Sequence, residues 1–123
     1  MPDFEKLKKG WEFDLIFRTG IRVNGDLVRL LYLQENDGGI KFACTVAKRF
    51  AKAHQRNRGR RIMREAFRQL AKNHKIIPNI KIILSLREKG LEAKTQEIYN
   101  ELEKLFTRKK LIQKKCSHLP KSP

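Results

Sequence analysis

The chain has 123 residues, of which 29 are Lys or Arg and 13 are Asp or Glu, so its formal net charge is +16. This length fits one domain with one core, and the hydrophobic share of 40% excludes a disordered basic tail. A small protein carries such a charge excess only if a polyanion offsets it, so a nucleic acid is the expected partner.

Membranes and oxidising compartments are disfavoured by the same sequence. No stretch approaches the roughly 18 apolar residues of a membrane span, and residues 1–10 alternate charged with apolar residues, unlike a signal peptide. We therefore expect a cytoplasmic protein without a membrane partner. Cys44 lies in an apolar run and Cys116 in a basic segment, so the pair has neither zinc-site spacing nor a disulfide framework. Cys116 and His118 supply only two possible ligands, so no metal site is predicted.

The first periodic segment predicts a short helix over residues 11–18 that ends at Gly20. The apolar residues on one face of this helix are Phe13, Ile16 and Phe17. Trp11 and Leu15 lie on another side, so the helix has more apolar surface than one buried face requires. We expect part of this surface to be exposed for a ligand.

Two strands are predicted next, over residues 27–33 and 40–47, with turn residues between them and a short extra strand at 21–23. In the second strand, alternation places Phe42, Cys44 and Val46 on one face. The other face carries Lys41, Ala43, Thr45 and Ala47. Because this face is small, polar and basic, we interpret it as a binding floor and not as a core.

Residues 52–73 follow as one long helix. Its buried stripe is Ile62, Met63, Ala66, Phe67 and Leu70. Residues 80–86 form a nearly continuous apolar run, typical of a central strand covered on both faces. A last helix begins near Thr95, a suitable cap. Its core face is Ile98, Leu102, Leu105 and Phe106, and its outward residues are Glu101, Glu103 and Lys104.

These elements predict an α+β fold in which helices pack against a mixed sheet, in a single domain of residues 1–110. Beyond it, basic residues dilute the apolar pattern, and prolines stand at positions 120 and 123. Residues 111–123 are therefore expected to be a disordered basic tail.

The segment from residue 48 to residue 68 holds nine cations and a single acid, Glu65. The cations are Lys48, Arg49, Lys52, Arg56, Arg58, Arg60, Arg61, Arg64 and Arg68. An ordinary exposed helix interleaves acids with bases, because like charges one turn apart repel. A basic face kept for solubility is the alternative, but it would be served by Lys spread around the molecule. Arg instead grips phosphate with two parallel hydrogen bonds and stacks on bases, so the segment predicts RNA binding.

Residues 45–68 read Thr-Val-Ala-Lys-Arg-Phe-Ala-Lys-Ala-His-Gln-Arg-Asn-Arg-Gly-Arg-Arg-Ile-Met-Arg-Glu-Ala-Phe-Arg. This segment resembles the signature of the bacterial ribonuclease P protein subunit, in which a strand leads into a helix that bears Arg-Asn-Arg. The Phe13 and Phe17 pair, Arg87 at the end of a strand, and the order of the elements support the resemblance.

The resemblance implies an α-β sandwich of order αβββαβα with a left-handed crossover through the arginine helix, although right-handed crossovers dominate in proteins. It also implies a function. In the family, a larger catalytic RNA removes the 5′ leader of precursor tRNA, the arginine helix binds that RNA, and a cleft holds the single-stranded leader.

Two sets of site residues follow from the resemblance. The set expected to bind the RNA subunit is Lys48, Arg49, Arg56, Asn57, Arg58, Arg60, Arg61, Arg64 and Arg68. The set expected to bind the leader is Phe13, Phe17, Arg29, Leu31, Lys41, Thr45, Arg56 and Arg64. Small strand residues let RNA approach the sheet, and exposed Phe rings offer stacking planes. For Phe13 and Phe17, simple core packing stays open as an alternative.

The chain departs from the family pattern at the entry of the arginine helix and inside it. Ala47, Ala51 and Lys52 stand where the family has Ser, Gly and often Asn, so the helix lacks its usual cap. Gly59 replaces an apolar residue inside the helix at a cost of about 1 kcal/mol.

No catalytic residue is predicted in the protein. The acids are scattered, whereas nucleases that use two metals need converging carboxylates, and His54 is expected to be a phosphate contact or a bystander. We expect the chemistry, with its Mg²⁺, to reside in the RNA subunit, and the partners to be ribonuclease P RNA and precursor tRNA. The protein alone is expected to be a monomer or to self-associate weakly. A structural RNA-binding protein of ribosomal type is the main alternative, followed by a DNA-binding regulator, for which no helix-turn-helix is visible.

Overall fold

In the computed structural model, residues 5–7, 10–34 and 39–114 are described. Their elements in chain order are β1 (Glu5–Lys6), α1 (Gly10–Thr19), β2 (Ile21–Asn24), β3 (Val28–Gln34), β4 (Ile40–Val46), α2 (Ala53–Asn73), β5 (His74–Ile76), β6 (Ile80–Leu86), the short helix η1 (Glu88–Gly90), α3 (Thr95–Arg108) and β7 (Ile112–Lys114). Without the short elements β1, β5, η1 and β7, the order is αβββαβα. The predicted fold class is confirmed.

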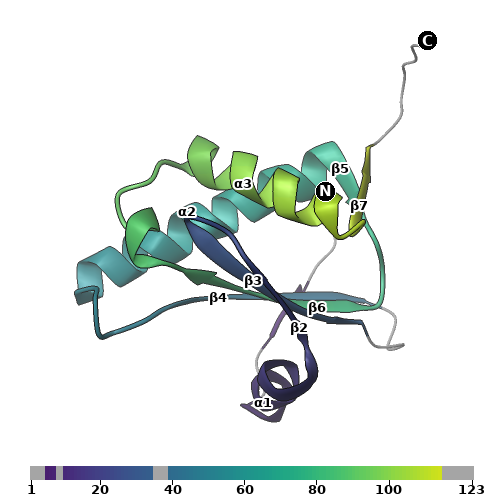
Figure 1. The fold of residues 1–123 in the computed structure, drawn as a ribbon, viewed down its shortest axis with the longest axis horizontal. Helices are drawn as coiled ribbons and strands as arrows, with labels where there is room; N and C mark the ends of the chain where they lie inside the picture. Colours follow the sequence, from purple (N-terminus) through teal and green to yellow (C-terminus); the bar gives the residue numbers. More distant parts are fainter. Residues whose placement is uncertain (1–4, 8–9, 35–38, 115–123) are drawn as a thin grey trace.

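The described residues form a five-stranded mixed sheet of order β1-β4-β6-β3-β2 and a two-stranded ribbon of β5 and β7. Helices α2 and α3 cover one face of the sheet, and α1 lies against the other (Figure 1). β6 pairs parallel with β4 and antiparallel with β3. The parallel pair is joined through α2, which makes this connection the crossover that the resemblance implies; its left hand is taken from that resemblance.

The larger core lies between the sheet and the two helices α2 and α3. All five apolar residues predicted for the buried stripe of α2 are buried, as are the four predicted for α3. Phe67 stacks on Phe42 of β4, with ring centroids 4.0 Å apart, and meets Phe106 of α3 at 6.2 Å. Helical spacing therefore predicted which side chains form this core, because each amphipathic face has one apolar layer to meet.

A second, smaller core lies on the opposite face of the sheet. It consists of Leu7, Ile16, Leu31, Ala43 and Ile83, with Phe13 and Leu33 packed against it. The prediction that this side of β4 is only a binding floor is therefore wrong at Ala43, which α1 covers. The open part of the floor lies nearer the end of the strand.

Gly59 allows α2 to approach the sheet closely. A Cβ atom at this position would lie 2.7 Å from Cδ2 of Leu86 and 3.1 Å from Cγ2 of Val46. The missing side chain costs helix propensity, but it lets the arginine helix sit against the ends of β4 and β6. The glycine that departs from the family pattern is thus explained by packing.

The position of Glu101 on α3 predicted that its side chain would point into solvent, but it does not. Its carboxylate accepts hydrogen bonds from the backbone N–H groups of Asp26, Leu27 and Val28, at 3.1, 2.8 and 2.7 Å. These bonds to a charged acceptor tie the turn between β2 and β3 to α3. The prediction is wrong because the partner lies more than seventy residues away in sequence.

The start of the expected tail belongs to the fold. Leu111 is buried, and β7 pairs antiparallel with β5 in the register Ile76↔Ile112. The prediction of disorder is therefore wrong for residues 111–114, and the rest of the predicted tail lies outside the described residues. A basic composition dilutes the apolar pattern without preventing backbone pairing.

Candidate nucleic-acid interface

Helix α2 displays the predicted arginine surface. Its apolar side is buried, and its other side carries the cations at intervals of three and four residues, which keeps them on one face. Of the residues predicted to bind the RNA subunit, those that the structure leaves exposed are Lys48, Arg49, Asn57, Arg58, Arg61, Arg64 and Arg68. Arg56 and Arg60 are half-buried.

Several of these arginines are held by neighbours. Arg56 donates to the carbonyl of Ala51 at 2.9 Å, Arg60 donates to the side chain of Asn57, and Arg68 pairs with Glu65 at 2.8 Å. These bonds limit side-chain freedom, so less entropy remains to be lost when a phosphate binds. The surface is partly organised before any ligand arrives.

Arg58 is turned toward the protein. Its two terminal nitrogens donate to the carbonyls of Leu91 and Ala93, at 2.7 and 2.9 Å. These carbonyls belong to the link between η1 and α3, on the side of α2 away from α1. The side chain of Arg58 therefore ties α2 to the start of α3, while the residue stays exposed; its predicted contact with the RNA subunit stays a prediction.

The start of α2 compensates for its missing cap. The side chain of Gln55 accepts a hydrogen bond from the backbone N–H of Lys52 at 2.8 Å, which is one half of a capping box. The first turn contains no acid, and the cations Lys48 and Arg49 precede the helix. The positive end of the helix dipole and this positive charge together favour an anion at this place.

A hollow of about 390 Å³ opens on the sheet floor where β4 and β6 end. Its lining residues include Arg29, Thr45, Arg49, Ser85 and Arg87, and we call it the floor hollow. The hydroxyl oxygens of Thr45 and Ser85 lie 3.0 Å apart. Arg29 donates to Asn24, and Arg87 to the carbonyl of Gly25. Three arginines thus surround a floor of small hydroxyl side chains, an arrangement suited to a phosphate backbone.

A second hollow, of about 410 Å³, lies along the edge of β4 beneath α2. We call it the edge groove, and its lining residues are Lys6, Leu7, Phe13, Phe42, Ala43, Cys44, Arg60 and Arg64. It shares no lining residue with the floor hollow. The predicted leader residues are therefore divided: Arg29 and Thr45 line the floor hollow, whereas Phe13 and Arg64 line the edge groove.

The two aromatic residues of α1 have different surroundings. Phe17 is 46% exposed, so simple core packing does not describe it. Phe13 is half-buried, lines the edge groove and packs against the smaller core. The two rings stand one helical turn apart on the same flank of α1. Leu31, by contrast, is buried beneath α1, so its prediction as a leader contact is wrong.

Comparison with known proteins decides the family. The model of the Ribonuclease P family matches residues 1–110. A ribonuclease P protein component of Thermoanaerobacter sp. (strain X514) is 33% identical over 101 residues, which cover 82% of this chain and 85% of that protein. One from Chlamydia trachomatis serovar L2 is 36% identical over 88 residues, 71% of each chain. The chain belongs to the ribonuclease P protein family.

Solved structures agree with this assignment at the level of the fold. The RNase P protein of Staphylococcus aureus superposes with a TM-score of 0.75 and 24% identity, over 88% of this chain and 97% of that one. The RNase P protein of Thermotoga maritima gives 0.73 and 24%, over 85% and 96%. Family membership makes the chain an RNA-binding component of a ribonucleoprotein that processes tRNA, with a role in an endoribonuclease complex. No helix among the described residues is long and apolar enough to span a membrane.

Lys41, a predicted leader residue, is engaged in a charge cluster at the start of α1. The buried carboxylate of Glu12 lies 3.0 Å from the Nζ of Lys41 and 3.4 Å from the Nζ of Lys81. Burial would raise the pKa of Glu12, but hydrogen bonds and the charges of both lysines outweigh burial and lower its pKa. Lys81 also lies 5.5 Å from the ring centre of Trp11. In this ribonuclease P family member, the cluster fixes α1 to β4 and β6.

No local sequence pattern predicts this cluster. The available signal was Lys81 inside an apolar strand, because a lysine there is buried only with a partner. Its partner, Glu12, lies in a different element, and only the fold brings them together.

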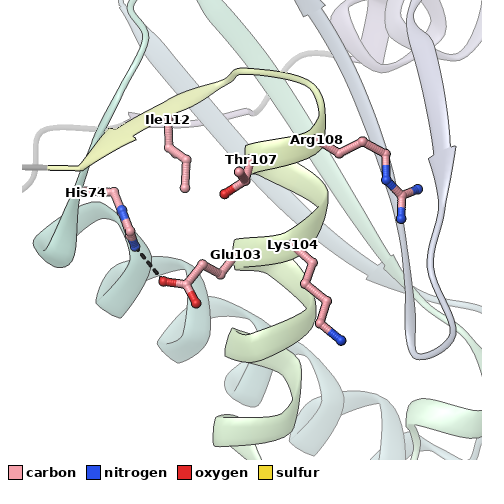
Figure 2. Close-up of a pocket in the computed structure, with 6 residues that line it drawn as sticks. All are labelled: His74, Glu103, Lys104, Thr107, Arg108 and Ile112. Atoms are coloured by element: carbon pink, nitrogen blue, oxygen red, sulfur yellow. Dashed lines mark hydrogen bonds and ion pairs between the residues drawn. The ribbon is translucent and has the colours of Figure 1, made fainter.

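A further hollow, of about 650 Å³, lies at the opposite end of the α2 and α3 layer from Arg58. It is lined by His74, Glu103, Lys104, Thr107, Arg108 and Ile112. Figure 2 shows the ring of His74 pointing to the carboxylate of Glu103, at 2.8 Å. None of the predicted site residues lies there. Within the described parts of the chain, no three His, Cys, Asp or Glu side chains are grouped so as to hold a metal ion.

Proposed function

We propose that this chain binds the catalytic RNA of ribonuclease P through the exposed arginine face of α2, and the single-stranded 5′ leader of precursor tRNA across the floor hollow. The observation that carries the first part is the row of cations on α2, with Arg61, Arg64 and Arg68 exposed. A row of exposed guanidinium groups on one rigid helix can follow a phosphate backbone.

The floor hollow and α1 support the second part. Thr45 and Ser85 leave room for a strand of RNA at the sheet, while Arg29, Arg49 and Arg87 stand around it. Phe17 offers an exposed ring on α1 for base stacking. A single strand fits this combination better than a duplex does, because stacking on a side chain requires an unpaired base.

We assign the cleavage step, and the Mg²⁺ that it uses, to the RNA subunit. The protein supplies positive charge, a formal +16, where two polyanions must meet. It therefore acts by raising the affinity for precursor tRNA and by reducing repulsion between the two RNAs.

The test of this function is reconstitution with a bacterial ribonuclease P RNA. Cleavage of precursor tRNA is measured at low Mg²⁺, where the RNA alone is slow because little counter-charge is present. We expect the added chain to restore cleavage at the 5′ end of the mature tRNA. Absence of any stimulation by a folded chain that binds the RNA would disprove the proposed role.

Replacing Phe17 by alanine is expected to weaken binding of precursor tRNA to the holoenzyme by about tenfold, since stacking on a side chain is worth roughly 1 to 3 kcal/mol per base. Mature tRNA, which lacks the leader, is expected to bind as before. The measurement is the dissociation constant of each tRNA, together with the melting temperature of the variant.

The matched control is Ile21→Ala, since Ile21 is also apolar and is 50% exposed, but offers no aromatic ring. It is expected to leave both affinities unchanged. Equal weakening of both tRNAs by Phe17→Ala, or a large drop in its melting temperature, would contradict the assignment of Phe17 to the leader.

A further inference from the structure

Among the described residues, the outer edge of strand β4 is paired only near its start. β1 pairs with β4 only at Lys41 and Phe42, and the next contact, from the N–H of Leu7 to the carbonyl of Phe42, ends this pairing. The other edge of β4 is paired with β6 over its whole length. Beyond Phe42, no described residue pairs with the outer edge of β4.

Two backbone hydrogen bonds show in which direction the N–H and C=O groups along this edge point. The carbonyl of Phe42 points outward, because it accepts from Leu7, and the carbonyl of Gly39 points inward, because it accepts from Ile80 of β6. Backbone groups alternate along a strand, so those of Cys44 point outward as those of Phe42 do. Cys44 thus has one N–H donor and one C=O acceptor side by side on this outer edge, and no residue of ranges 5–7, 10–34 or 39–114 pairs with them there.

This outer edge lies in the edge groove. Arg60 and Arg64 of α2 line the groove, and Phe13 of α1 contributes an aromatic wall. Among the groove's residues, the charged ones are all cations: Lys6, Arg60 and Arg64. An apolar slot with cations and an adjacent donor and acceptor fits a flat polar ring attached to a phosphate.

We propose that the edge groove binds one unpaired nucleotide of the RNA subunit, whose base edge pairs with the backbone N–H and C=O of Cys44 while Arg60 and Arg64 hold its phosphates. Each nucleobase has a donor and an acceptor next to each other on its pairing edge, and this edge is free only when the base is unpaired. The inference rests on the proposed function and adds to it a site that recognises single-stranded RNA.

The RNA subunit is the occupant that the geometry favours over the leader. Arg60 and Arg64 belong to the same face of α2 as Arg61 and Arg68, so an RNA bound along that face passes over the groove. The floor hollow, proposed for the leader, shares no lining residue with it. Two separate hollows can thus serve two RNAs at once.

The backbone amide of Cys44 can be observed on its own, because cysteine is rare in this chain and the thiol of Cys44 does not interfere. Burial raises the pKa of its thiol to about 12, and the nearby charges of Arg64 and Arg60 offset this only in part, so the thiol stays neutral and unreactive at neutral pH. The chain contains two cysteines. Labelling with ¹⁵N-cysteine in a Cys116→Ser background therefore leaves one labelled amide, that of Cys44.

The decisive experiment measures the hydrogen-exchange rate of this amide in the free protein, with a bacterial ribonuclease P RNA, and with precursor tRNA alone. We expect slowing of at least tenfold with the ribonuclease P RNA and no slowing with precursor tRNA. Slowing by precursor tRNA alone would assign the groove to the leader and overturn the proposal. The proposal would also be overturned if the amide of Cys44 were already protected from exchange in the free protein. The same holds if the amide stayed unprotected after the holoenzyme had formed.

A pair of variants tests the same site by affinity. Cys44→Leu fills the groove and is expected to weaken binding of the ribonuclease P RNA by about tenfold, the loss of one good contact. Cys44→Ala leaves the groove open and is expected to bind normally. Equal affinities of the two variants would overturn the proposal. If the unaltered chain does not bind the ribonuclease P RNA at all, the proposed function itself is wrong. This outcome differs from a loss of affinity in Cys44→Leu alone, which concerns only the edge groove.

Discussion

Replacing Arg60 and Arg61 together by alanine is expected to weaken binding of ribonuclease P RNA roughly twentyfold near 0.15 M salt. Each phosphate contact that is lost leaves about 0.7 to 0.9 of a counterion bound to the RNA, so the slope of log K against log salt becomes shallower by about 1.5. The measurement is the dissociation constant at four or five salt concentrations. The fold is expected to survive, because Arg61 is exposed, Arg60 is only half-buried, and neither side chain belongs to the hydrophobic core.

The control for net charge is Lys104→Ala with Arg108→Ala. These two exposed cations lie near the end of α3, away from the exposed arginine face of α2. Loss of two charges there is expected to change the affinity much less. Equal weakening by both double variants would mean that total charge, and not the arginine face, determines binding.

Replacing Glu12 by glutamine is expected to lower the free energy of unfolding at pH 7 by about 3 kcal/mol, because it removes the counter-charge of a buried ion pair. Glu12 is 3% exposed, and the ammonium group of Lys81 beside it is equally buried. The measurement is chemical unfolding of the unaltered chain and the variant at several pH values.

The difference in the free energy of unfolding between the unaltered chain and Glu12→Gln is expected to shrink in acid. Because the pKa of Glu12 in the folded protein is lowered from its ordinary value of 4.5, its carboxylate stabilises the fold above about pH 4.5, and this contribution disappears as the pH falls through the lowered pKa. Protonated Glu12 then resembles glutamine. A difference that persists undiminished at pH 2 to 3 would contradict the assignment.

Glu65→Gln provides the comparison for this experiment. Glu65 also pairs with one cation, Arg68, but both side chains are about half-exposed, and such surface pairs contribute between about 0 and 1 kcal/mol. This variant is therefore expected to unfold like the unaltered chain at each pH.

The elements of the fold could be predicted from local patterns. The strand at Ile80–Leu86 has the predicted bounds, and the other helices and strands that were predicted differ by one or two residues at their ends, whereas the short strands β1, β5 and β7 were not predicted. The reason is that helical and strand periodicity are properties of neighbouring residues, which the chain order displays directly. The same holds for the density of arginine along α2.

Contacts between distant segments could not be predicted in this way. Glu101 was predicted to face outward, yet it binds the turn after β2; Glu12, which no local pattern singled out, lies between two lysines. Arg58 and Arg61 are indistinguishable in the sequence pattern, but only Arg58 reaches the start of α3. Which neighbour a charged side chain meets depends on how the layers are stacked.

The sequence by itself determined that this is a basic, single-domain α+β protein with an arginine helix of ribonuclease P type, because composition, periodicity and a contiguous signature are all local properties. Only the tertiary structure decided that the predicted leader residues divide between a floor hollow and an edge groove, that Leu31 is core, and that Cys44 lines the edge groove. These features depend on which strands pair and on where α1 crosses the sheet. Such long-range geometry brings together residues that the sequence keeps far apart.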